Sequence, residues 1–183
     1  MGTFYTLARC KFAANLPGQA IVEFAMTVTV VLILLCASID FGRAFSEMQA
    51  ISELTRQGSN LASRGSTLPQ AVQAVVTGES GLDLKDFGDV IITSVTNKKN
   101  VYTISAQESS TKDGLTSLSQ TSKVGSAVGG PATLPTAAQN TVQDGQTIFV
   151  TEIYYTFTPA TGIVALTKNA VNLPSTLYGS AYF

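Results

Sequence analysis

The chain has 183 residues, of which 13% are charged and 45% are hydrophobic, and its formal net charge is −1. This near-neutral balance offers no basic surface, so no nucleic-acid partner is predicted. The sequence has no histidine, which excludes Ser-His and Cys-His nucleophile pairs and histidine-ligated zinc. No carboxylate pair, serine motif or acidic cluster has catalytic or metal-ligand spacing. We therefore expect no enzyme activity, no cofactor or metal, and no small-molecule substrate.

A long apolar segment follows a short basic stretch at the N-terminus. Residues 1–18 contain Arg9 and Lys11 but no acid, and residues 19–39 are apolar except for five scattered polar side chains. At about 1.5 Å per residue, a helix over this segment is about 30 Å long and can cross a bilayer. Because positive charge stays on the cytoplasmic side, we expect the basic leader (residues 1–18) inside, a transmembrane helix over residues 19–40, and the remainder exported.

Glu23 is the one charged residue of the apolar segment. A carboxylate at the bilayer centre costs about 2.5–3.5 kcal/mol and far less at the interface, so one interpretation places Glu23 among the lipid headgroups. The other interpretation requires cleavage after Gly18. The new amino group of Gln19 would then pair with Glu23 between neighbouring helices and set their axial register.

Three simpler interpretations of the segment stay open. It could be a secretory signal peptide cleaved near Cys36, although its charged region would then include Glu23 and its apolar core would be unusually long. It could be a lipoprotein signal at Cys36, although Leu35 stands where a small residue is expected. It could also be a plain uncleaved anchor.

Gly18 followed by Glu23 resembles the class III signal that prepilin peptidases cleave after the glycine. The wider pattern is similar to the TadE-like proteins, which are pilin-like proteins of tight-adherence (Flp) pilus systems. The similarity rests on Gly18-Gln19-Ala20-Ile21-Val22-Glu23-Phe24-Ala25 and on Ile39-Asp40-Phe41-Gly42-Arg43-Ala44-Phe45. It continues weakly through residues 56–63 and returns in the aromatic stretch at residues 149–159.

This resemblance implies a processing site at Gly18 and Gln19 and a role in assembly and register for Glu23 and Phe24. The partners that it implies are the lipid bilayer, a prepilin peptidase, and other pilin-like subunits or the pilus assembly machinery. The large exported part favours a minor subunit, because the major subunits of such pili are much smaller.

The helical pattern continues beyond the membrane segment over residues 41–64. Its first clear stop is Gly65, which can adopt a left-handed cap, so the pattern predicts one helix from about residue 19 to residue 64. Apolar residues recur at helical spacing and indicate a core face or a filament seam, of which we favour the core face. They are Phe41, Phe45, Met48, Ile51, Leu54, Gly58 and Leu61. Gly42 and Gly58 suggest close packing or a hinge at the membrane exit.

Residues 65–183 are predicted to form an exported α+β head. The pattern indicates a short helix, a hairpin and a further strand, at residues 68–76, 89–96 with 100–106, and 146–158. The aromatic tail at residues 177–183 can complete the sheet. The Ser/Thr/Gly-rich segment 109–146 is predicted to be a long exposed loop, either a mobile linker, which we favour, or a surface for adhesion or partner contact.

The predicted fold class is therefore α+β and pilin-like, with a long N-terminal helix packed on a small antiparallel sheet. The predicted function is a structural or assembly component of a tight-adherence pilus, in the cytoplasmic membrane or in the extracellular pilus. The alternative is a single-span anchored protein whose exported head binds a partner and forms no filament.

Overall fold

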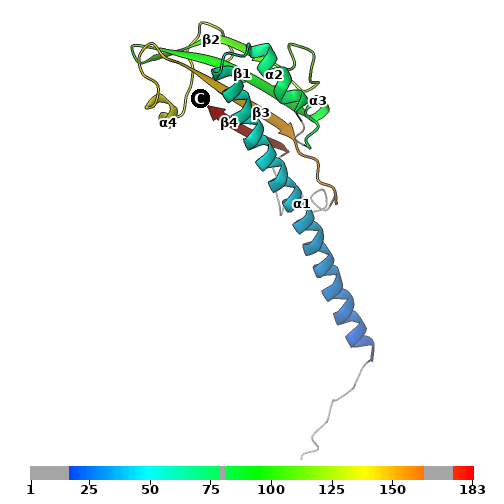
Figure 1. Ribbon diagram of the computed structural model, residues 1–183. Coiled ribbons are helices and arrows are strands. Elements are labelled where there is room, and N and C mark those ends of the chain that lie inside the picture. The colour runs from blue at the N-terminus through cyan, green and yellow to red at the C-terminus, as the bar shows by residue number, and fades with distance from the viewer. Residues whose placement is uncertain (1–16, 79–80, 163–174) are drawn as a thin grey trace, which may run out of the picture.

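The computed structural model describes residues 17–78, 81–162 and 175–183. A long helix, α1 (Pro17–Ser63), protrudes from a head that contains a four-stranded antiparallel sheet (Figure 1). This is the predicted α+β architecture, and it is consistent with a pilin-like fold. Residues 1–16, most of the predicted leader, lie outside the described residues.

Helix α1 has 47 residues and is therefore about 70 Å long. It starts at Pro17, where the fixed backbone angle of proline suits the first helical turn. It ends two residues before Gly65, which has a φ of 96°. The amide of Gly65 donates to the carbonyl of Ala62 and that of Ser66 to the carbonyl of Leu61. This is the Schellman pattern of a glycine-terminated helix, so the predicted stop is confirmed.

The sheet has the strand order β2-β1-β3-β4, and all three pairings are antiparallel. Its strands are β1 (Gly88–Lys98), β2 (Val101–Ser109), β3 (Thr147–Thr156) and β4 (Thr176–Tyr182). Lys99 and Asn100 form the β1–β2 turn with φ values of 52° and 64°, as a two-residue hairpin turn requires. The predicted hairpin, the later strand and the tail strand are all present.

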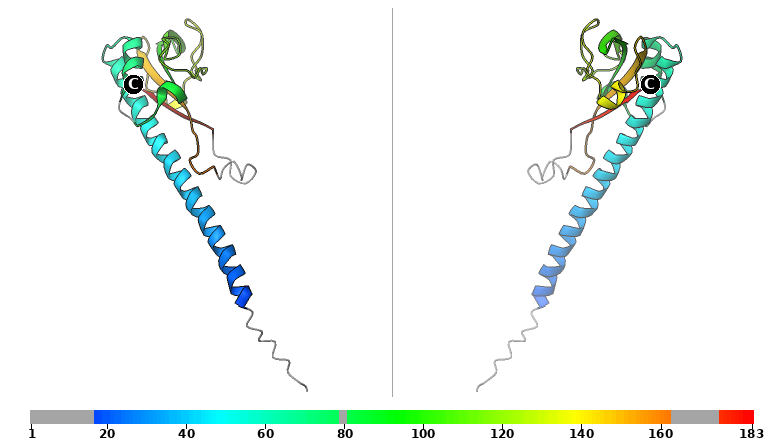
Figure 2. Two further views of the ribbon diagram at one scale, coloured as in Figure 1. Left: turned by 90° about the vertical axis from the view of Figure 1, so that its right-hand side faces the viewer. Right: turned by 90° about the vertical axis from the view of Figure 1, so that its left-hand side faces the viewer.

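Two helices cover one face of the sheet. The second half of α1 crosses β3 and β4, and α2 (Leu68–Thr77) packs beside α1 and above β1 (Figure 2). The side chains between these layers form the main core, which includes Ile51, Val72, Val75, Ile92 and Ile153, all at most 1% exposed. The short helix over residues 68–76 was predicted, and its role is to close this core.

The opposite face of the sheet is covered by the segment that joins β2 to β3. Val124, Leu134 and Ala138 of this segment pack on Val95 and Val150 of the sheet. Two short helices, α3 (Leu84–Phe87) and α4 (Thr136–Gln139), lie at the margins. The prediction of an irregular segment is confirmed, but the preferred interpretation as a mobile linker is wrong. A few widely spaced apolar residues suffice to hold the segment because its backbone also bonds to β2.

Candidate functional site

The predicted processing residues lie at the exposed start of α1. Gly18 and Gln19 are in its first turn, and both are exposed. Glu23 follows about one turn later, and Phe24 beside it is 70% exposed. In the described part of the chain, the Glu23 carboxylate makes no hydrogen bond or ion pair. The structure therefore leaves all four residues accessible to other molecules, while their predicted roles stay predictions.

The first half of α1 presents apolar side chains on every side. From Ile21 to Ile39 its large apolar residues are between 37% and 70% exposed. Within the described residues this is the one helix long and apolar enough to cross a membrane, with a mean hydropathy of 2.5 over its most apolar window. A helix that is apolar all round needs an apolar environment, so this half of α1 is suited to be a single-span membrane anchor.

The hydroxyl groups within this apolar half bond to the helix itself. Thr27 donates to the carbonyl of Glu23, Thr29 to that of Ala25 and Ser38 to that of Leu34, each at 2.8 Å. A hydroxyl in hydrocarbon is costly when it lacks a partner. These bonds let three polar residues lie within the apolar half without unsatisfied groups.

The apolar surface does not end where the helix reaches the head. Phe41, Phe45 and Met48 are 65%, 59% and 41% exposed, so the prediction that they belong to the core face is wrong. The residues that face the head at this level are Asp40 and Ala44, and the predicted stripe joins the core only from Ile51 onward. The exposed stripe therefore runs about two turns past the segment predicted to lie in the membrane.

Asp40 explains why the helix is turned this way. Its carboxylate is 0% exposed and accepts the backbone amides of Ala160 and Thr161 at 2.9 and 3.2 Å. The Thr161 hydroxyl donates to the other carboxylate oxygen. Because these donors lie on the head, Asp40 must face inward, and the neighbouring Phe41 must face outward. The sequence pattern lacked this signal, because a charged residue was not expected on the buried face.

Farther along α1, Gly58 and Ser59 hold the helix against the sheet. A Cβ atom at Gly58 would lie 2.9 Å from the side chain of Thr151, so the backbone approaches β3 as closely as only glycine permits. The Ser59 hydroxyl bonds to the Thr151 hydroxyl at 2.9 Å and to the Ala181 carbonyl at 2.8 Å. The prediction of close packing is thus confirmed at Gly58. At Gly42 no described atom lies within 4 Å of the position that a Cβ would take, so this glycine makes no close contact with the head, and the alternative of a hinge there stays a prediction.

The head contains a buried carboxylate that sequence reasoning missed. Glu152 of β3 is 0% exposed. It accepts the backbone amide of Lys123 at 3.0 Å and the hydroxyl of Tyr178 at 2.9 Å, and the Ser122 hydroxyl also donates to it. The sequence pattern predicted this strand, but it did not indicate that Glu152 would be buried. The β2–β3 segment covers the face of the sheet on which Glu152 lies.

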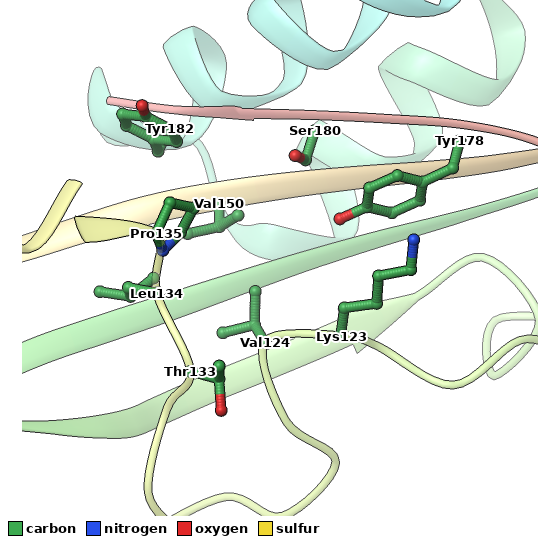
Figure 3. Close-up of a pocket in the computed structure, with 9 residues that line it drawn as sticks. All are labelled: Lys123, Val124, Thr133, Leu134, Pro135, Val150, Tyr178, Ser180 and Tyr182. Carbon is green, nitrogen blue, oxygen red and sulfur yellow. The ribbon is translucent and has the colours of Figure 1, made fainter. Parts of the chain in front are cut away.

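A pocket of about 370 Å³ opens beside this carboxylate, between β4 and the β2–β3 segment (Figure 3). Its walls include Val124, Leu134 and Val150 together with the side chains of Lys123 and Tyr178. Burial raises the pKa of Tyr178 to about 12, against the opposing effect of Ser180 and with the help of the nearby Glu152 charge. Within the described residues, no group of three or more His, Cys, Asp or Glu side chains could hold a metal ion.

Comparison with known proteins is consistent with the N-terminal pattern. Residues 18–60 match the family model described as TadE-like protein. No curated protein and no solved structure matches the chain. The matched residues cover the exposed apolar half of α1, Asp40 and the close contact at Gly58, and they end before the head continues at α2.

Proposed function

We propose, from the TadE-like segment at residues 18–60, that this chain is a pilin-like subunit of a tight-adherence pilus system, anchored in the membrane by α1. The observation that carries this proposal is the apolar half of α1, which is exposed on every side and receives no cover from the described residues. A bilayer would cover it before assembly, and the helices of other subunits would cover it in a pilus.

The proposal includes processing by a prepilin peptidase between Gly18 and Gln19. Both residues are exposed at the start of α1, which fits access by a protease. After cleavage, the amino group of Gln19 and the carboxylate of Glu23 would pair between neighbouring helices. Such a pair costs little while both groups remain near the interface, and it sets the register when subunits assemble. Phe24 would pack beside this contact.

The proposed location is the cytoplasmic membrane, with the leader inside and the head exported. Arg9 and Lys11 support this orientation, because basic residues before a first span stay on the cytoplasmic side. The size of the head supports a minor subunit or an assembly factor more than the repeating subunit.

The first experiment is the intact mass and N-terminal sequence of the chain from native membranes. A chain that starts at Gln19 is the expected result. A chain that retains Met1 would overturn the processing step and return Glu23 to the role of an interfacial carboxylate. The second is Glu23→Ala, which should insert into the membrane normally but fail to enter sheared pilus fractions. The control is Glu53→Ala, an exposed carboxylate on the same helix.

A single-span anchored binding protein is the second candidate. The pocket of the head is the observation that favours it, since an assembly helix alone does not require one. The two candidates differ in fractionation: a pilus subunit is recovered with sheared filaments, whereas an anchored binding protein stays entirely with the membrane.

A further inference from the structure

The two edge strands of the sheet, β2 and β4, differ in whether another segment bonds to them. At the β2 edge, the amide of Gly129 donates to the carbonyl of Ile104 at 2.7 Å. The amide of Ile104 donates to the carbonyl of Gly130 at 3.0 Å. Ala132 donates to the carbonyl of Tyr102 at 2.8 Å. At the β4 edge, the described residues provide no such cover. An uncovered edge strand is a template for another strand, so β4 is the edge at which the sheet can grow.

The register of β4 determines which backbone groups it offers. Phe149 and Phe183 exchange both backbone hydrogen bonds, at 2.8 and 3.0 Å. In an antiparallel pair, bonded and non-bonded positions alternate, and the register pairs Val150 with Tyr182. The amide and carbonyl groups of Tyr178, Ser180 and Tyr182 therefore point away from β3. No described residue bonds to these groups, so they can bond to an added strand.

The same three residues direct their side chains into the pocket. Tyr178, Ser180 and Tyr182 line it from β4, facing Lys123 and the walls formed by the β2–β3 segment (Figure 3). The free backbone edge and the apolar hollow are thus adjoining parts of one surface. Strand-addition sites use this combination: the edge supplies main-chain hydrogen bonds, and the hollow takes every second side chain.

The ammonium group of Lys123 at the pocket indicates which charge a bound strand would carry. Its ammonium group lies 3.4 Å from the centre of the Tyr178 ring, and it forms no ion pair with any carboxylate in the described chain. Glu152 lies near Lys123 in space, but its oxygens accept from Ser122, Tyr178 and the Lys123 backbone amide, and not from the Lys123 ammonium group. An ammonium group without an ion pair, beside an apolar hollow, is complementary to a carboxylate.

We propose that β4 binds an extended acidic segment of a partner polypeptide by strand addition, with an apolar side chain in the pocket and a Glu or Asp carboxylate on Lys123. The Glu152 contacts prepare this site, because they fix the Lys123 backbone and the Tyr178 ring before a partner arrives. The site lies on the head, so it is independent of the helix that carries the proposed assembly.

The test uses the full chain in lipid nanodiscs and a defined set of capped eight-residue peptides. Threonine occupies every second position of these peptides, and the others are Val, Phe or Glu; each Glu peptide has a counterpart with Gln in place of Glu. Hydrogen exchange of the fragment that covers residues 176–183 is the readout. In the free protein, the three outward amides should exchange fast and the inward ones slowly. At least one Glu-containing peptide should slow the outward amides about tenfold.

Two matched controls test the mode of binding. N-methylation of the peptide amides that face β4 should abolish the protection, since it removes the main-chain donors. Lys123→Gln should weaken binding of a Glu peptide about tenfold or more, yet leave binding of its Gln counterpart unchanged. Lys85→Gln, an exposed lysine on α3, should behave as the wild type.

Several outcomes would overturn the proposal. One is that no peptide of the set protects the β4 amides; another is that N-methylated peptides bind as well as the others. Equal weakening of Glu and Gln peptides by Lys123→Gln would remove the acidic requirement. Protection that grows with protein concentration without peptide would assign the edge to a second copy of the chain instead.

Discussion

Asp40 and Thr161 are joined at the base of the head although they lie 121 positions apart in the sequence. The Asp40 carboxylate accepts the Thr161 amide at 3.2 Å and also its hydroxyl, and it is completely buried. This contact ties the chain that leaves β3 to the helix, at the level where the predicted membrane segment ends. It therefore fixes the rotation of α1 relative to the head.

We expect Asp40→Asn to weaken this connection. Asparagine keeps one acceptor oxygen but places an NH2 group opposite donors, and hydrogen bonds to a charged acceptor contribute about 1.5–3 kcal/mol. The free energy of unfolding should fall by about 2 kcal/mol in urea titrations of the micelle-bound chain. Hydrogen exchange at residues 157–162 should become faster. Glu53→Gln, at an exposed position of the same helix, is the control, and an Asp40→Asn variant as stable as this control would contradict the expectation.

The sequence predicted α1 well because its signals are local. A continuous apolar run sets the first half, and Gly65 after the last turn sets the end. The rotation of the helix could not be predicted, because it depends on the contact between Asp40 and Thr161, which is a long-range contact. Hydrophobic periodicity alone predicted that Phe41, Phe45 and Met48 belong to the core face, whereas they are exposed in the structure.

The head shows the same division between local and long-range signals. The hairpin and the last two strands follow from β-branched and aromatic alternation and from the turn signal at residues 97–100. The cover on the second face could not be predicted, because the β2–β3 segment has few apolar residues and folds through backbone bonds to β2. For the same reason, neither the burial of Glu152 nor the pocket could be predicted from the sequence.

Gly58→Ala should destabilise the protein relative to Gly42→Ala. Both changes gain about 1 kcal/mol of helix propensity. At Gly58 the new methyl group would lie 2.9 Å from the Thr151 side chain and 3.1 Å from Val75, and overpacking of this kind costs about 1–3 kcal/mol. At Gly42 the methyl group meets nothing within 4 Å. We expect a difference of about 2 kcal/mol in the free energy of unfolding; equal stability of the two variants would show that the helix can move away from β3.

Glu152→Gln should loosen the cover of the second face. The carboxylate accepts from the Lys123 amide, Ser122 and Tyr178, and the amide nitrogen of glutamine would oppose one of these donors. A buried donor without a partner costs about 1–3 kcal/mol, so we expect a loss of about that size in the free energy of unfolding. Exchange of the Lys123 amide should rise more than that of the α1 amides near Ile51. Equal acceleration at both places would indicate global unfolding instead of local loosening.

The stability of the head should fall at alkaline pH because of Tyr178. Burial raises its pKa to about 12, partly offset by Ser180 and reinforced by Glu152, whereas tyrosine in an unfolded chain has a pKa of about 10. Burial also raises the pKa of Tyr154, and the Glu152 charge adds to this effect. Since the folded pKa lies above the unfolded one, the stabilising contribution of the neutral hydroxyl is complete below about pH 10 and is lost as the pH rises through about 12.

Urea titrations at a series of pH values, with phenolate absorbance recorded in parallel, measure this dependence. The free energy of unfolding of the wild type should decline across the window from about pH 10 to about pH 12. Tyr178→Phe should be less stable at neutral pH, because Glu152 loses a donor at 2.9 Å, but its decline across the window should be smaller. Tyr182→Phe, at a 40% exposed position of the same strand, is the matched control. An unchanged decline in Tyr178→Phe would mean that this hydroxyl does not cause the alkaline loss of stability.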